Sequence, residues 1–96
     1  MLFAISCTDK PDSLDLRLEN RPAHIEFLKA NGGAIQVAGP YTGEDGEGMT
    51  GSLLIVEAAD LAAAQVLAAG DPYAQAGLFE HVDIRPWKWV IGNPDV

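Results

Sequence analysis

Three basic side chains recur at helical spacing in the first third of the sequence. Arg17, Arg21 and His24 stand at i, i+4 and i+7, so on a continuous helix they share one face. The same segment carries an apolar stripe made of Leu14, Leu18, Ile25 and Leu28. Arg21 falls within this stripe, and Arg17 and His24 lie along its border. Basic groups on the core side need a carboxylate, a carbonyl or a bound anion, so both arginines are candidates to hold an anionic substrate group. The alternative is that their stems only cover apolar surface.

A carboxylate partner for His24 is available at Asp71, which follows a predicted helix and precedes Pro72. A carboxylate that is hydrogen-bonded to one imidazole nitrogen fixes the tautomer and leaves the other nitrogen to exchange a proton with substrate. The alternative is that Asp71 only initiates a turn, as aspartate before proline commonly does. We predict that His24 and Asp71 form a catalytic pair.

The other reactive residue types give weaker signals. His81 lies in a predicted strand with nothing local to single it out, and Cys7 is expected to be a buried core residue. The serines lack the context of a hydrolase nucleophile. No group of histidines, cysteines and carboxylates has a metal-binding spacing, so we expect neither a metal nor a cofactor.

The pattern of apolar residues and turn formers predicts how the chain positions these side chains. We expect strands at residues 2–7, 34–38, 51–56 and 80–90, and helices from Ser13 to about residue 30 and over residues 60–69. Pro22 predicts a kink or break in the first helix, Gly39 and Pro40 should end the second strand, and residues 43–48 should form a loop. This βαββαβ order predicts an α+β fold of ferredoxin-like type, with an antiparallel four-stranded sheet and two helices on one face.

Length and charge narrow the classes of partner. With 96 residues, the chain is expected to form a single domain over residues 1–96. A formal net charge of −8 argues against binding nucleic acid. No segment reaches the length of a membrane helix, and the single cysteine cannot form an intramolecular disulfide, so we expect a cytoplasmic protein without membrane attachment.

Several short motifs together resemble the YciI-like family over nearly the whole chain. They are Arg17-x-x-x-Arg21-Pro22-Ala23-His24-x-x-x-Leu28, Gly39-Pro40, Gly51-Ser52, Asp71-Pro72-Tyr73, Ala76-Gly77-Leu78 and Pro86-Trp87. The resemblance implies a ferredoxin-like domain that pairs into a dimeric α+β barrel, with His24 and Asp71 matching a His/Asp pair in a cleft. It also implies proton-transfer chemistry of the lyase or isomerase kind on a small cyclic substrate, as in dehydrochlorination of hydroxylated aromatics. Ser52 and Tyr73, which lie in these motifs, join Arg17 and Arg21 as candidates for substrate binding.

Two functions of different class remain open from the sequence. The first is a small lyase or isomerase that uses His24 and Asp71 for acid-base catalysis on a small anionic or cyclic substrate. The second is a non-catalytic dimer that binds a small ligand or a partner domain through the same cleft, because no nucleophile or cofactor motif is present. Either way a homodimer is expected, because the sheet has an uncovered face and Trp87 and Trp89 require burial.

Overall fold

Four strands and three helices make up the computed structural model, which describes residues 1–95. In chain order they are β1 (Leu2–Asp9), α1 (Leu14–Ala30), β2 (Ile35–Thr42), β3 (Met49–Glu57), α2 (Leu61–Ala69), α3 (Pro72–Gln75) and β4 (Phe79–Trp87). None of the helices in this part of the chain is long and apolar enough to cross a membrane.

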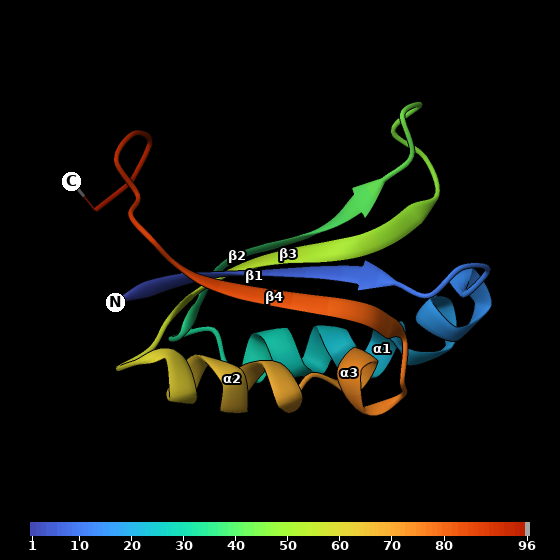
Figure 1. Ribbon diagram of the computed structural model, residues 1–96, viewed down its shortest axis with the longest axis horizontal. Coiled ribbons are helices and arrows are strands. Elements are labelled where there is room, and N and C mark those ends of the chain that lie inside the picture. Colours follow the sequence, from blue (N-terminus) through green and yellow to red (C-terminus); the bar gives the residue numbers. More distant parts are fainter. Residues whose placement is uncertain (96) are drawn as a thin grey trace.

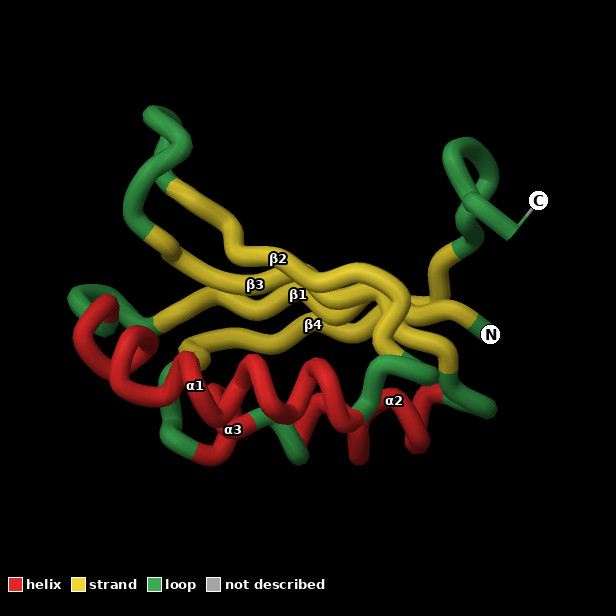
Figure 2. The backbone as a smooth tube through the Cα atoms, turned by 180° about the vertical axis from the view of Figure 1, so that it is seen from behind, coloured by secondary structure: helices red, strands yellow, loops and turns green. Residues whose placement is uncertain are grey.

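The strands form one antiparallel sheet in the order β2-β3-β1-β4. All three helices lie against the same face of this sheet, and the opposite face is left without helices (Figure 1). Figure 2 shows the same two layers from behind, with α1 and α2 running beneath the strands. This arrangement confirms the predicted ferredoxin-like α+β fold.

Alternation along the central strands places the core between the sheet and the helices. Phe3, Ile5 and Cys7 of β1 point to the helical side and are buried. Their partners Val56, Leu54 and Ser52 on β3 point the same way, so they extend the same layer. Phe27, Leu28, Leu67 and Ala68 of the helices pack onto this layer from below.

The first helix differs from its prediction in the residues that it buries, and of the kink or break predicted at Pro22 the break is absent. It continues through Pro22 without a break, and its buried residues are Arg17 and His24. Leu14 and Leu18, expected to face the core, are more than 40% exposed, and Arg21 is exposed as well. Only the first half of the stripe turns outward, since Leu28 still packs against the core. Arg17 and His24 take the buried positions because they find buried carboxylates that compensate them.

The predicted end of the second strand was also wrong. β2 runs through Gly39 and Pro40 to Thr42, and Pro40 pairs with Ser52. β2 is an edge strand, so one of its sides has no neighbouring strand. A proline is tolerated there because its missing backbone N–H is not needed for a ladder hydrogen bond. The last strand ends at Trp87, so Trp89 lies beyond it, although the two indole rings still contact each other at a centroid distance of 5.8 Å.

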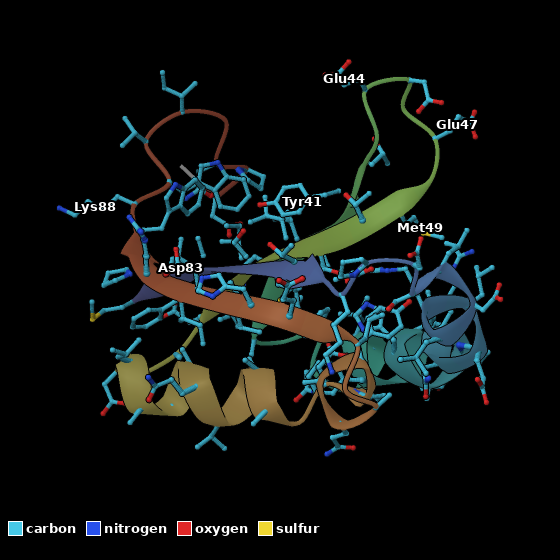
Figure 3. All side chains as sticks on the ribbon, turned by 45° about the vertical axis from the view of Figure 1, so that its right-hand side comes forward. Tyr41, Glu44, Glu47, Met49, Asp83 and Lys88 are labelled. Atoms are coloured by element: carbon cyan, nitrogen blue, oxygen red, sulfur yellow. The ribbon has the colours of Figure 1, made fainter. Side chains whose placement is uncertain are left out.

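The outer face of the sheet lies between two projecting segments. The connection between β2 and β3 rises on one side, and the segment after β4 rises on the other (Figures 1 and 2). Figure 3 shows Tyr41 on this outer face, with Glu44 and Glu47 at the tip of the first segment and Lys88 on the second. Tyr41 is hydrogen-bonded to Ser6 across the face, with 3.0 Å between the hydroxyl oxygens.

Candidate active site

The two residues predicted as a catalytic pair are in contact. Nδ1 of His24 lies 2.8 Å from Oδ1 of Asp71, and both residues are buried. Because a carboxylate oxygen can only accept, Nδ1 carries the proton in this hydrogen bond. Nε2 makes no hydrogen bond within residues 1–95, so the second ring nitrogen is available to a ligand.

Local structure explains why Asp71 is so well placed. Asp71 is the N-cap of α3, and its Oδ1 accepts a hydrogen bond of 2.9 Å from the backbone nitrogen of Tyr73. The same oxygen of Asp71 therefore stabilises the turn and makes the contact with His24. α1 and α3 pack against each other, which brings the side chains of His24 and Asp71 together although they stand 47 residues apart in the sequence.

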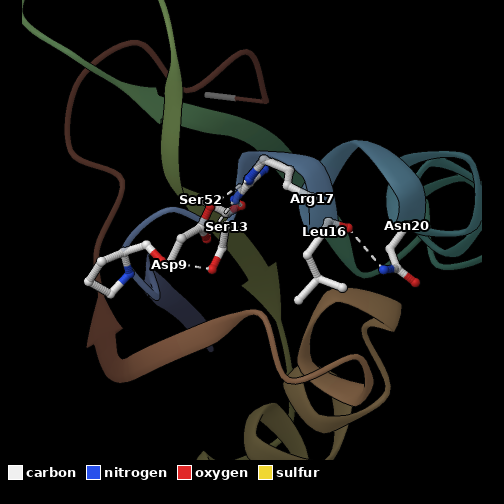
Figure 4. A network of polar contacts seen from close by, with 7 residues as sticks. Asp9, Ser13, Leu16, Arg17, Asn20 and Ser52 are labelled. Atoms are coloured by element: carbon white, nitrogen blue, oxygen red, sulfur yellow. Dashed lines mark hydrogen bonds and ion pairs between the residues drawn. The ribbon is translucent and has the colours of Figure 1, made fainter.

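Arg17 lies at the centre of a buried polar network (Figure 4). Its Nε donates to Oδ2 of Asp9 at 2.8 Å and its Nη2 donates to Oδ1 of Asp9 at 3.0 Å. Nη2 also donates to Oγ of Ser52 at 2.8 Å. Burial disfavours the charged guanidinium, but the hydrogen bond and negative charge of Asp9 outweigh this and raise the pKa of Arg17. The positive charge of Arg17 is thus already compensated inside the protein.

Tyr73 connects this network to the histidine. Its ring stacks on the imidazole of His24, with centroids 4.0 Å apart and an angle of 14° between the planes. On Arg17, the guanidinium carbon lies 4.5 Å from the centroid of the Tyr73 ring, within the range of a cation–π interaction. Burial raises the pKa of the Tyr73 hydroxyl, and the charge of Arg17 opposes that rise in part. Tyr73 therefore holds the imidazole plane and is itself held by the arginine.

A small cavity of about 140 Å³ opens beside these residues, between α1 and the inner face of β2 and β3. All but one of the predicted site residues line it, namely His24, Arg17, Arg21, Ser52 and Tyr73, together with apolar residues that include Pro40 and Met49. Arg21 differs from Arg17 because it is exposed and has no ion pair within residues 1–95. It is the arginine whose charge is available to a ligand at the cavity.

The remaining candidates lie apart from this cavity. His81 is exposed on β4, as expected for a histidine without a specific role. Cys7 is buried, and burial, with added repulsion from Asp71 and Asp9, raises the pKa of its thiol to about 12. Within residues 1–95 no group of three or more histidines, cysteines and carboxylates could hold a metal ion.

Asp9 is a site residue that sequence reasoning missed. It lies at the end of β1, where it reads as part of the turn that follows the strand. The available signal was the need of a core-facing arginine for a carboxylate, but periodicity alone did not indicate which arginine was buried. Asp9 is eight residues from Arg17 and meets it across that turn.

The fold and the buried pair define a class: a ferredoxin-like α+β protein with a His/Asp pair beside a small cavity. Residues 1–88 match the model of the YCII-related domain. The chain belongs to this family.

Comparison with individual proteins gives the same assignment. The chain is 43% identical to Protein YciI of Escherichia coli O6:H1 over 98 residues, covering 95% of this chain and all of the relative. It is 36% identical to an uncharacterized protein of Haemophilus influenzae, again over 95% of this chain and all of the relative.

Among solved structures, it resembles the 5-chloro-2-hydroxyhydroquinone dehydrochlorinase TftG of Burkholderia phenoliruptrix AC1100, solved in complex with 2,5-dihydroxybenzoquinone. That match has a TM-score of 0.82 and 40% identity and covers 92% of this chain and 94% of TftG. An antibiotic biosynthesis monooxygenase shares the fold at a TM-score of 0.57 with 15% identity, over 94% of this chain and 99% of that one.

Proposed function

We propose that this protein is a small-molecule enzyme of the lyase or isomerase kind, in which His24 transfers protons and Asp71 orients it. The observation that carries the proposal is the 2.8 Å contact between Nδ1 of His24 and Oδ1 of Asp71 beside a cavity. A buried carboxylate that holds the Nδ1 proton leaves Nε2 as the atom that exchanges a proton with substrate. The similarity to TftG supports elimination as the reaction type.

For a chlorinated hydroxyhydroquinone the proposed steps balance without an oxidant or a cofactor. A hydroxyl proton moves to the ring carbon that carries chlorine, which turns that part of the ring into a ketone. Loss of a second hydroxyl proton then drives departure of chloride with the carbon–chlorine electron pair, and a hydroxyquinone remains. The net change is loss of one proton and one chloride ion. Nε2 of His24 is the proposed carrier of the protons.

The arginines have different proposed roles. Arg21, exposed at the cavity, is the candidate to hold a phenolate or carboxylate oxygen of the substrate. Arg17 already donates to Asp9 and Ser52, so we assign it to positioning Ser52 and Tyr73 at the cavity wall. The candidate substrate is therefore a small ring compound with at least one anionic oxygen.

The test measures chloride release from 5-chloro-2-hydroxyhydroquinone by the purified protein. Asp71→Asn and His24→Gln should lower kcat/KM by about 10²–10⁴-fold, the range of acid-base catalysis. The chain offers matched controls: His81→Gln replaces the exposed histidine, and Asp60→Asn replaces the N-cap of α2, where a carboxylate caps Ala63 without contacting a histidine. Both controls should keep full activity.

A second readout separates a structural role for Asp71 from an orienting one. Asparagine at position 71 can still accept from the Tyr73 amide, but it no longer offers a carboxylate to His24. The ¹⁵N chemical shifts of His24 should therefore show the Nδ1–H tautomer in the parent and a mixture in Asp71→Asn. Unchanged shifts together with full activity would show that Asp71 is only a turn residue, whereas no chloride release by the parent protein would favour the non-catalytic ligand-binding dimer.

We also propose that two chains pair through the outer face of the sheet. Val37 and Tyr41 on β2 and Trp87 on β4 are each about 40% exposed there, and no helix of residues 1–95 covers this face (Figure 1). A second copy placed face to face would bury it between the projecting segments. Light scattering should report twice the chain mass, and Val37→Glu should yield the monomer. A monomer for the parent at micromolar concentration would refute the pairing.

We expect this dimer in the cytoplasm, where a lone thiol such as Cys7 stays reduced.

A further inference from the structure

A second and larger cavity lies on the other side of the catalytic pair. It has a volume of about 320 Å³ and lies between α2 and the inner face of β1 and β4. Figure 1 shows α2 running beneath β4 along this side of the molecule. The wall is mostly apolar and includes Ile5, Phe27, Leu67, Phe79 and Ile84. Gln65 of α2 and Val82 of β4 are exposed lining residues, so the cavity reaches the surface between these two elements.

Asp71 supplies the one carboxylate in the described lining of this apolar cavity. The side chain of Asp71 is 4% exposed, and both of its hydrogen bonds within residues 1–95 go to Oδ1. Oδ2 accepts none from the protein. A carboxylate oxygen that an apolar ligand covers carries a large desolvation penalty unless the ligand offers a donor. Because no buried side-chain oxygen or nitrogen of the described residues lacks a hydrogen-bond partner, Oδ2 keeps some surface that water or a ligand can reach.

We propose that this cavity is a binding site for a neutral phenol-type molecule, whose ring fills the apolar space and whose hydroxyl donates to Oδ2 of Asp71. The volume lies at the lower end of small-molecule sites, which matches a ligand of one ring. An anion would be repelled by the carboxylate, and an apolar molecule without a donor would leave Oδ2 unsatisfied. The thiol of Cys7, also in the lining, stays protonated at neutral pH and adds no second charge.

This site is distinct from the proposed catalytic cavity and does not depend on the proposed function. His24, Arg21 and Ser52 line the smaller cavity only, whereas Asp71 lines the larger one. The two cavities share Leu54 and meet at the His24–Asp71 contact. A phenol that donates to Oδ2 withdraws negative charge from the carboxylate that orients His24. Occupancy of the larger cavity should therefore change the ¹⁵N resonances of the imidazole.

The test uses two probes that differ in the hydroxyl group alone: 4-fluorophenol and fluorobenzene, followed by ¹⁹F NMR titration of the intact protein. We expect 4-fluorophenol to bind at least tenfold more tightly than fluorobenzene. Asp71→Asn places an amide donor or a neutral oxygen at the site, so it should remove most of that difference. The ¹⁵N resonances of His24 should shift on addition of 4-fluorophenol and not on addition of fluorobenzene.

Variants at the cavity walls locate the site. Val82→Trp, at an exposed position on an edge strand, should block the opening and abolish binding of both probes. Val66→Trp, at an exposed position of α2 that lines neither cavity, is the matched control, and Ala38→Leu narrows the smaller cavity; both should leave 4-fluorophenol affinity unchanged. The proposal is overturned if neither probe binds, if both bind equally, or if Ala38→Leu and not Val82→Trp weakens binding. Absence of chloride release in the catalytic assay would leave all these expectations in place.

Discussion

The ring of Tyr73 lies nearly parallel to the imidazole of His24, 4.0 Å from it centroid to centroid, and its centroid also lies 4.5 Å from the guanidinium carbon of Arg17. An aromatic ring between a buried arginine and a histidine both fills space and restricts rotation of the imidazole. This stack links the Arg17–Asp9 network to the His24–Asp71 pair. The integrity of the site should therefore depend also on Asp9, which does not line the catalytic cavity.

The first prediction concerns Tyr73 itself. Tyr73→Ala should lower the free energy of unfolding by about 3–5 kcal/mol, because the side chain is almost fully buried and its loss leaves a cavity. Tyr73→Phe keeps the stack and should cost less than about 1 kcal/mol. Tyr41→Ala, which removes a tyrosine 40% exposed on the outer face, is the control for loss of an aromatic ring in general. Equal losses for positions 41 and 73, measured by urea denaturation, would argue against the stack.

The second prediction compares two arginine–aspartate pairs that share an Nε-to-Oδ2 contact, the first of them with a further Nη2-to-Oδ1 hydrogen bond. Arg17→Gln should cost about 3–5 kcal/mol of stability, since it leaves the nearly buried carboxylate of Asp9 without its counter-charge. Arg85→Gln breaks a pair with Asp83 of the same kind, 2.7 Å apart but largely exposed, and should cost about 1 kcal/mol or less. Thermal unfolding of the two variants in the same buffer gives the comparison. A cost for Arg17→Gln no larger than that for Arg85→Gln would show that Asp9 is solvated.

The third prediction concerns a close approach between neighbouring strands. A Cβ on Gly51 would overlap the carbonyl oxygen of Cys7, which is backbone and cannot move aside cheaply. Gly51→Ala should therefore destabilise the protein by about 1–3 kcal/mol, the usual cost of overpacking. Gly39→Ala, on the adjacent strand with open space where the added methyl group would lie, should be nearly neutral. Chemical denaturation midpoints for the two variants test the difference, which would vanish if β1 and β3 can separate slightly.

The fourth prediction is a pH dependence of stability. Burial raises the pKa of the Cys7 thiol from its ordinary value of 9.0 to about 12. Between these values the unfolded chain has released the thiol proton and the folded chain has kept it, so rising pH favours unfolding. The stability that the protonated thiol contributes is fully present below pH 9 and is lost toward pH 12. Over this range the free energy of unfolding should fall by up to about 1.4 kcal/mol per pH unit.

Cys7→Ala is the control for this pH effect. It should start from a lower stability and lose less of it between about pH 9 and pH 11, as measured by urea unfolding at several pH values. Parallel curves for the parent and the variant would mean that the thiol titrates normally in the folded protein. Iodoacetamide should also react slowly with native Cys7 at about pH 8, because the side chain is buried and protonated.

Sequence patterns were sufficient for the architecture and for part of the site. Turn formers and apolar periodicity gave the βαββαβ order, and the Asp60 cap and the end at residue 69 placed α2 as observed. Boundaries were less accurate where local signals conflicted with sheet pairing. Gly39 and Pro40 are residue types that often end a strand, yet β2 continues through both. β3 supplies pairing partners along one side of β2, and the other side is a free edge where proline's missing backbone N–H is not needed.

The sequence by itself determined the types and order of the elements and singled out His24 and Asp71 as residues whose chemistry suits each other. Only the tertiary structure decided that Arg17 is buried and Arg21 is not, that Asp9 is the counter-charge, and that Tyr73 stacks on His24. The physical reason is that helical periodicity describes which residues share a face, but not how the helix is rotated against its sheet. That rotation depends on buried carboxylates contributed by β1 and by the start of α3, and their positions relative to α1 exist only once the chain has folded.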